Sequence, residues 1–308
     1  MHLLPVKTPE RVRSGGWRCK IAEAAAGGRT ISAMSGHFTA PATALAGALP
    51  GWVTLLRAPN PGPMTLTGTN TWVLRAAPGE PAVVIDPGPA DEAHLAAVAA
   101  QGPIGQVLIT HGHPDHTEGS ARLHDLLGGA PVRAADPAHT IGGTPLTGDV
   151  GDLGGDPLEI RLLNTPGHTA DSVCFLATHG DERVVLTGDT ILGQGTAVVA
   201  HPDGHLGDYL DSLELLSTYA GIPALPGHGP ALADCGAAAE FYLAHRRARL
   251  DQVRAALDAG ARTAAEVVAV VYADVDRSLW WAAQWSVRAQ LAYLGRESGA
   301  TDAELEQK

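Results

Sequence analysis

The stretch Thr110-His111-Gly112-His113-Pro114-Asp115-His116 decides how this chain is interpreted. It places three imidazoles and one carboxylate within six residues, and these are donors that a borderline divalent cation such as Zn²⁺ accepts. The apolar run Val107-Leu108-Ile109 just before it predicts a strand. The donors would then lie on a turn at the carboxyl end of that strand, where α/β sheets place their sites. On such a loop the first two histidines form one pair of ligands, and the Asp-His pair turns toward a neighbouring position.

Three further motifs follow along the chain, each after an apolar, strand-like run. They are Thr165-Pro166-Gly167-His168-Thr169, Gly188-Asp189-Thr190 and Pro226-Gly227-His228-Gly229-Pro230. Each motif alone is weak, because a glycine-flanked histidine is commonly a turn residue and a Gly-Asp pair is commonly a turn or a helix cap. Their order after the first cluster makes the set specific. Another pair, Gly148-Asp149, is rejected because it lies between glycine-rich segments and precedes the first of these motifs.

Length, charge and cysteine content restrict the class of protein. The 308 residues are 45% hydrophobic, enough for one large core and a small second domain. The net charge of −12 repels nucleic-acid backbones unless basic groups cluster locally. Cys19, Cys174 and Cys235 fit neither a disulfide framework nor a CxxC metal site, which favours a reducing compartment. No apolar run has the length of a membrane-spanning helix, so a cytoplasmic protein without a membrane partner is expected.

From Trp52 onward, β-rich apolar runs alternate with Ala/Leu-rich stretches, as in an α/β protein. Strands are predicted over Thr71–Arg75, Ala82–Ile85, Gln106–Thr110, Glu159–Leu163, Ser172–Ala177 and Arg183–Thr187. Helices are predicted over Asp91–Ala100, Glu118–Leu127 and Asp208–Tyr219. The donor motifs therefore fall at the ends of predicted strands.

Near Asp234 the composition changes to nearly pure helix. Helices are predicted over Ala237–Ala259, after a capping box at Thr263 over Val267–Tyr272, and after a Ser278 cap over Leu279–Leu294. A winged-helix-like unit is one interpretation, although no β-hairpin wing is visible after Gly295. A helical cap on the main domain is the favoured alternative.

The chain is accordingly divided into residues 1–50, 51–235 and 236–308. Residues 1–33 carry six Lys/Arg against two acidic residues and show no hydrophobic period. We expect residues 1–50 to be a disordered extension or the product of an over-called start, with translation beginning at Met34. A transit peptide is the alternative.

The ordered set HxHxDH, TPGHT, GDT and PGHG resembles the metallo-β-lactamase superfamily from Asn60 to about Asp234. The resemblance implies a four-layer αβ/βα sandwich over residues 51–235 and a binuclear metal site. It assigns the first metal to His111, His113 and His168. It assigns the second metal to Asp115, His116 and His228, with Asp189 as the bridge. Two Zn²⁺ per chain are expected, with Fe or Mn as alternatives.

Two details refine this resemblance. True β-lactamases of the superfamily usually carry Cys, or nothing, where this chain has Asp189, so the site is more similar to those of the glyoxalase II, ribonuclease and lactonase branches. Cys174 is then interpreted as a small core residue. Asp86 matches a position whose carboxylate supports the ligand loop, and a turn-initiating Asp before Pro-Gly is an equal alternative.

The stretch from Asn60 to Trp72 is long, turn-rich and distinctive. It resembles the beta-lactamase-like subgroup, which includes mitochondrial single-strand endoribonucleases and fungal thioesterases that release polyketides from acyl carrier protein. Weaker matches to that subgroup are Tyr209, Ser212, Leu213, the pair His245-Arg246 and the C-terminal helical unit. We favour an ordinary helix-surface aromatic for Tyr209 and a solvated helix face for Arg246, Arg247 and Arg249.

The expected reaction is hydrolysis. Two metals sharing Asp189 and a water would bring the pKa of that water toward neutrality, and the resulting hydroxide would attack an electrophilic carbonyl or phosphorus. Asp115 is the expected catalytic residue, which orients the nucleophile or takes its proton. Because a two-metal site catalyses acyl and phosphoryl transfer alike, the substrate class has to be inferred from the charge and residue types of the rest of the surface.

Four functions follow in order of preference. A thioester, other acyl ester or lactone, small or linked to an acyl carrier, fits the acidic charge and comes first. Cleavage of single-stranded RNA is the alternative, supported by the basic run His245–Arg249 and opposed by the scarcity of stacking residues. A mono-iron sulfur dioxygenase and a non-catalytic metal-binding module come last.

Overall fold

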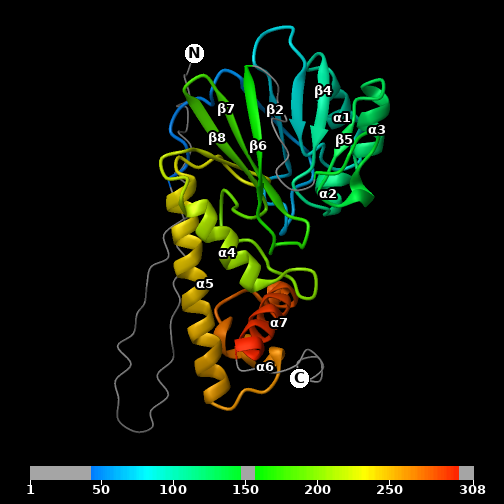
Figure 1. Cartoon of the computed structure of the whole chain (residues 1–308). Helices are drawn as coiled ribbons and strands as arrows, with labels where there is room; N and C mark the ends of the chain where they lie inside the picture. The colour runs from blue at the N-terminus through cyan, green and yellow to red at the C-terminus, as the bar shows by residue number, and fades with distance from the viewer. Residues whose placement is uncertain (1–42, 147–156, 298–308) are drawn as a thin grey trace, which may run out of the picture. The chain divides into compact units, whose positions relative to one another are not determined.

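Two β-sheets carry the fold in the computed structural model, which describes residues 43–146 and 157–297 (Figure 1). The expectations for residues 1–33, including a start at Met34, and the rejected Gly148-Asp149 pair lie outside the described residues. Among the described residues, no helix combines the length and the apolar character needed to cross a membrane.

The first sheet has the strand order β1-β2-β3-β4-β5. Its strands are β1 Val53–Arg57, β2 Asn70–Leu74, β3 Ala82–Ile85, β4 Ile104–Leu108 and β5 Val132–Arg133. The pairs β1–β2 and β2–β3 are antiparallel, whereas β3–β4 and β4–β5 are parallel. The donor-rich stretch therefore begins just after a parallel strand, at the carboxyl edge of this sheet.

The second sheet has the order β6-β7-β8-β9. Its strands are β6 Leu158–Asn164, β7 Val173–His179, β8 Glu182–Gly188 and β9 Ala224–Pro226. The strands β6, β7 and β8 are antiparallel neighbours, and β9 runs parallel to β8. The GDT and PGHG motifs follow these two parallel strands and so leave the sheet at the same edge.

Helices cover the outer faces of both sheets. The helices within the described residues are α1 Glu92–Ala99, α2 Pro114–Thr117, α3 Ser120–Leu126, α4 Leu206–Ser217, α5 Cys235–Asp258, α6 Ala264–Val271 and α7 Trp280–Glu297, and of these α1, α3, α4 and α5 pack on the sheets. One hydrophobic cluster joins the first sheet to α1 and α3, a second lies between the sheets, and a third joins the second sheet to α4 and α5. The predicted four-layer αβ/βα sandwich is thereby confirmed.

Alternation along the strands produces these layers. In β2, Trp72 and Leu74 face the second sheet while Val73 between them faces the helices, because successive side chains of a strand point to opposite faces. Every residue of β2 and β3 is buried, as expected for strands covered on both faces.

The predicted helix Glu118–Leu127 is present as α3, which begins two residues later than predicted, and the short α2 before it was not predicted. The chain forms the short α2, and a new helix, α3, begins after Gly119, whose backbone N–H donates to the Gly88 carbonyl over 2.9 Å. A Cβ at Gly119 would lie 2.7 Å from a Leu95 methyl group and 2.9 Å from that carbonyl oxygen. The contact of Gly119 with the Gly88 loop thus separates α2 from α3.

The C-terminal helices form a fourth cluster in which α5, α6 and α7 pack together (Figure 1). The predicted capping box of Thr263 and Glu266 is present, and Gly260 follows α5 with φ 108°, a left-handed conformation that favours glycine. The predicted Ser278 cap is wrong: Asp276 accepts from the Ser278 N–H, and a 3₁₀ turn over Arg277–Leu279 precedes α7. An aspartate carboxylate is a strong acceptor for such an N–H, so the cap lies two residues earlier than predicted and begins the 3₁₀ turn.

Candidate metal centre

All seven predicted metal ligands meet at the carboxyl edges of the two sheets. The first four, His111, His113, Asp115 and His116, leave the end of β4 and enter α2. The other three, His168, Asp189 and His228, follow β6, β8 and β9. Each sheet therefore contributes part of one cluster, although the residues are far apart in the chain.

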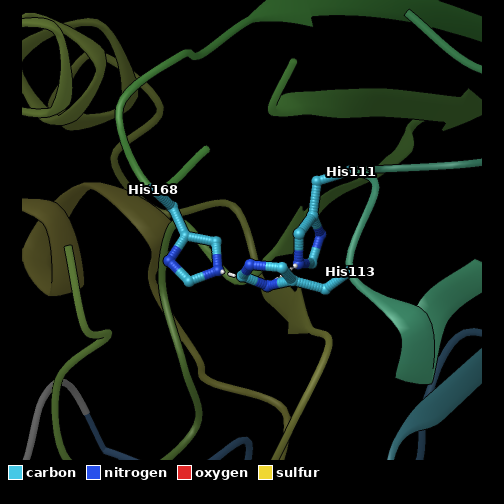
Figure 2. Close-up of side chains that lie close together, drawn as sticks. All are labelled: His111, His113 and His168. Atoms are coloured by element: carbon cyan, nitrogen blue, oxygen red, sulfur yellow. Dashed lines mark hydrogen bonds between the residues drawn. The ribbon is translucent and has the colours of Figure 1, made fainter. Parts of the chain in front are cut away.

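The donor atoms form two groups. In the first, Nδ1 of His113 lies 3.0 Å from Nε2 of His111 and 3.2 Å from Nε2 of His168 (Figure 2). In the second, Oδ2 of Asp115 lies 3.2 Å from Nε2 of His228 and 3.4 Å from Nε2 of His116. The two groups match the two sets of three that the resemblance implies.

Asp189 lies between these groups. Its Oδ2 is 3.2 Å from Nε2 of His228 and 3.8 Å from Nε2 of His168, and its Oδ1 is 3.6 Å from Nε2 of His116. Oδ1 is buried and has no hydrogen-bond partner among the described residues. A buried carboxylate oxygen without a donor is costly unless a cation compensates it.

The hydrogen bonds of the other ring nitrogens fix which nitrogen each histidine presents. Nδ1 of His168 faces the Val198 carbonyl over 2.8 Å and must donate to it, so Nε2 carries the lone pair. The Thr110 hydroxyl donates its single proton to Asp86 and therefore accepts from Nδ1 of His111 over 3.0 Å. In both rings the bare Nε2 is directed into the cluster.

This arrangement fits two divalent cations. Ligands at about 2.0–2.1 Å from a tetrahedral zinc are separated from one another by about 3.3 Å, and the donor atoms here lie 3.0 to 3.8 Å apart. Nε2 of His116 and Nε2 of His228 face each other at 3.3 Å, with carboxylate oxygens of Asp115 and Asp189 beside them. Nitrogen lone pairs that converge in this way need a cation or a proton between them.

The two groups differ in charge. Burial lowers the pKa of His168 to about 4 and brings that of His111 well below its usual value, so these two imidazoles of the first group are neutral. Burial also lowers the pKa of His228, but the carboxylates of Asp189 and Asp115 outweigh it and raise the pKa to about 10. The second group is thus the one in which carboxylates attract positive charge.

Asp86 supports the ligand loop from behind. Its carboxylate accepts from the Thr110 N–H over 2.8 Å, from the Thr110 hydroxyl over 2.7 Å and from Nδ1 of His116 over 2.8 Å. It therefore directs Nε2 of His116 into the second group. Of the two interpretations of Asp86, the structure supports the one in which it holds the ligand loop.

Gly227 has to be glycine for the cluster to form. A Cβ there would lie 2.5 Å from Oδ1 of Asp189 and 2.7 Å from Cε1 of His116. The glycine next to His228 in the PGHG motif therefore allows the ligands of different strands to approach one another.

The expectation of a solvated helix face for Arg246 and of a surface aromatic for Tyr209 is wrong. Arg246 is 4% exposed, donates to the Ala197 carbonyl and lies over the Tyr209 ring at 5.1 Å. Tyr209 is fully buried and donates to the Thr190 carbonyl. The sequence gives no sign that Arg246 is buried, because its partner is a backbone carbonyl, and every residue type has one.

Cys174 is a buried core residue, as predicted, and burial raises the pKa of its thiol to about 11.

Two residues that the sequence motifs did not indicate individually, Asn60 and Thr69, lie beside Asp115. The distinctive stretch Asn60–Trp72 is their only sequence signal.

Comparison with known families agrees with this geometry. The family described as "Metallo-beta-lactamase superfamily" matches residues 64–228, and the family described as "Beta-lactamase associated winged helix domain" matches residues 263–302. The second match confirms the winged-helix-like interpretation of the C-terminal helices, rather than the favoured alternative of a helical cap on the main domain. The last five residues of this match lie outside the described part of the chain.

Several curated proteins are similar in sequence. "Beta-lactamase-like protein 2 homolog" of Drosophila melanogaster is 31% identical over 262 residues, which cover 77% of this chain and 86% of that protein. "Atrochrysone carboxyl ACP thioesterase" of Passalora fulva is 33% identical over 233 residues, 69% of this chain and 66% of that protein. "Lactamase-like protein nscB" of Aspergillus fumigatus is 32% identical, and the chain spans only 59% of its length.

A solved structure shares the arrangement of elements. The metallo-beta-lactamase family protein of Thermus thermophilus superposes with a TM-score of 0.66 at 26% identity, covering 82% of this chain and 95% of that one. A beta-lactamase domain protein of Burkholderia ambifaria gives a TM-score of 0.68 at 22% identity, covering 81% and 88%, and so supports the fold alone.

Proposed function

This chain belongs to the metallo-β-lactamase superfamily, and from that premise we propose that it is a binuclear zinc hydrolase acting on a thioester or a related acyl ester or lactone. The observation that carries the proposal is the pair of donor groups that share Asp189. One of these groups alone would suit a structural metal. Two groups joined by a carboxylate suit the activation of water between two cations.

The proposed roles follow the two groups. His111, His113 and His168 would hold one metal, and Asp115, His116 and His228 the other, with Asp189 shared. Bound metals would lower the pKa of a water and polarise the substrate carbonyl.

Asp115 is the proposed catalytic residue. Among the seven residues only His113 and Asp115 are partly exposed, and the Asp115 side chain is 26% accessible, so substrate would approach from their side. Burial opposes ionisation of Asp115, but the hydrogen bond from His228 and the nearby imidazoles outweigh it and lower its pKa to about 2. The side chain is therefore a carboxylate at neutral pH, able to orient a water or accept its proton at the entrance of the site.

The surface supports acyl rather than phosphoryl substrates. The net charge is −12, and the basic run His245–Arg249 does not present a free cationic face. Arg246 is buried, the exposed Arg247 pairs with Glu214 at 3.0 Å, and Arg249 lies over the Tyr272 ring and donates to the Val271 carbonyl. The relative named as an acyl-carrier-protein thioesterase, 33% identical, also supports acyl chemistry.

A metal assay followed by a substrate panel tests this proposal. Purified protein should contain two zinc ions per chain and hydrolyse an acyl-N-acetylcysteamine thioester in a chelator-sensitive manner. Asp189→Ala should lose at least about 100-fold in kcat/KM. Loss of a residue that only supports a ligand costs about 10–100-fold, and loss of a ligand shared by both metals should cost more. The exposed Asp251→Ala serves as the matched control and should keep full activity.

Other outcomes would redirect the assignment. One iron per chain without hydrolysis would contradict the dizinc proposal. Cleavage of a labelled single-stranded RNA by the wild type but not by Asp189→Ala, with no thioester turnover, would replace the acyl substrate with RNA.

A further inference from the structure

Asn60 and Thr69 form a hydrogen-bonded pair beside Asp115, in the segment between β1 and β2. The Thr69 hydroxyl donates to Oδ2 of Asp115 over 3.0 Å, and Nδ2 of Asn60 donates to the same hydroxyl over 2.9 Å. Oδ1 of Asn60 accepts from the Thr69 N–H over 2.9 Å, which fixes the orientation of the amide. Because a hydroxyl has one proton, and Asn60 already donates to it, that proton is committed to Asp115.

The pair acts on the atom of Asp115 that belongs to the second donor group. Oδ2 lies 3.2 Å from Nε2 of His228 and 3.4 Å from Nε2 of His116. The Asp115 side chain is 26% exposed, whereas both imidazoles are buried, so packing restrains it less than it restrains them. The hydrogen bond from the fully buried Thr69 fixes this oxygen toward the two imidazoles.

The same segment also holds the loop that carries His228. The Asn70 N–H donates to the Gly227 carbonyl over 2.8 Å, and Nδ2 of Asn70 donates to the carbonyls of Pro226 and Gly229 over 2.9 Å each. Nδ1 of His228 lies 3.4 Å from the Gly68 carbonyl. Within the described residues, the hydrogen bonds of Asn60–Asn70 reach two members of the second group and none of the first.

We propose that Asn60 and Thr69 are positioning residues that set the affinity of the second metal group without affecting the first. The inference rests on the proposed binuclear site and assigns a task to the distinctive stretch that follows Asn60. Without the Thr69 hydroxyl, Oδ2 of Asp115 loses the donor that directs it, and the group retains two imidazoles and a carboxylate free to turn toward solvent. The protein would then bind one metal tightly and the second weakly.

Zinc titration against a chromophoric chelator tests this with the full-length, metal-stripped chain. Thr69→Val removes the hydroxyl and nearly preserves the shape, and the second zinc should bind about 10–100-fold more weakly while the first keeps its affinity. Thr69→Ser restores a hydroxyl and should restore the second zinc. Asn60→Ala should weaken it in the same direction.

Thr71→Val is the matched control. Thr71 is buried two residues further on, and its hydroxyl is paired with Nε2 of His94 at 2.9 Å, away from the donor groups. This variant should bind both zinc ions as the wild type does. An equal loss in Thr71→Val and Thr69→Val would mean that the segment matters only for folding, and would overturn the inference.

The outcomes separate this inference from the proposed function. A wild type that binds fewer than two zinc ions would contradict the binuclear site itself. A wild type with two ions and a Thr69→Val variant with two unchanged affinities would overturn the positioning role alone. If Thr69→Val fails to fold by circular dichroism, Asn60→Ala and Thr69→Ser decide: the former must weaken the second zinc and the latter must not.

Discussion

Asp86 is a buried residue with a left-handed backbone, φ 54°. A side chain other than glycine pays about 1–2 kcal/mol for that conformation, and it persists only where the surroundings require it. Here the requirement is the carboxylate, which accepts three hydrogen bonds from Thr110 and His116. The local backbone conformation is thus tied to the direction of one ligand ring.

Replacing that carboxylate with an amide should therefore weaken metal binding more than folding. Asp86→Asn keeps the shape but removes the charge behind His116, and zinc affinity should fall about 10–100-fold. Competitive zinc titration measures the effect. Asp91→Asn changes an aspartate that only caps α1, where Asn serves as well, and should leave the affinity unchanged. Equal affinities in wild type and Asp86→Asn would contradict this role.

Among single residues, the sequence predicted those whose side chains can bind a metal. Histidines and aspartates at strand ends, in a given order, indicated the seven residues that the structure brings together, and their role as metal ligands stays a prediction. Thr69 and Asn60 could not be found in this way, because neutral polar side chains are common in turns. Arg246 was misassigned because its partner is a backbone carbonyl, which no sequence pattern reveals.

Helix α5 links two parts of the fold. Its first turns, with Ala238 and Tyr242, belong to the cluster under the second sheet, and its last turns, with Val253 and Ala256, belong to the cluster with α6 and α7. The predicted domain boundary near residue 236 stays a prediction, and this helix contributes to the cores on both sides of it.

The first turns of α5 also hold the loop after Asp189. The Tyr242 hydroxyl accepts from the Leu192 N–H over 2.9 Å and donates to the Gly195 carbonyl over 3.0 Å. Three residues further on, the Val198 carbonyl accepts from His168. A helix remote from the metal groups thereby fixes the backbone on which one ligand depends.

Removal of the Tyr242 hydroxyl should destabilise the folded chain. Tyr242→Phe leaves the buried Leu192 N–H without its partner, and the free energy of unfolding should fall by about 1–3 kcal/mol. Urea denaturation of the zinc-loaded protein measures it. Tyr219→Phe removes a partly exposed hydroxyl for which the described residues show no hydrogen bond, and it should stay within about 0.5 kcal/mol of wild type. A Tyr242→Phe change as small as this control would contradict the argument.

Element prediction succeeded where the pattern is long. Each of the six predicted strands is present, with its ends shifted by two residues at most. The missed strands are β1, the two-residue β5 and the three-residue β9. The last two are too short for any periodicity, and Val53–Arg57 suits a helix as well as an edge strand.

Across the whole molecule, the donor groups draw on both sheets, so bound metals would join the two halves of the sandwich. Composition predicted only an α/β protein, and the sandwich itself came from the resemblance. The C-terminal unit could not be decided from the sequence, since three helices without a visible wing suit a cap equally well. The match to the winged-helix family over residues 263–302 makes that distinction.

Metal removal should accordingly lower the melting temperature. At a free zinc concentration about 1,000 times the dissociation constant, binding stabilises the folded state by about 4 kcal/mol, or roughly 8–16 °C for a chain of this size. Differential scanning fluorimetry with a chelator, and again after zinc is restored, measures the shift. An unchanged melting temperature despite loss of zinc would show that the metals do not join the sheets.

The late position of His228 in the chain has a kinetic consequence. The second donor group is incomplete until β9 has paired with β8 and both sheets have docked. We therefore expect zinc to bind only weakly to the folding transition state. An interaction absent from that state changes the unfolding rate and leaves the folding rate nearly as it was. In stopped-flow experiments zinc should therefore prolong the lifetime of the folded chain without hastening its formation.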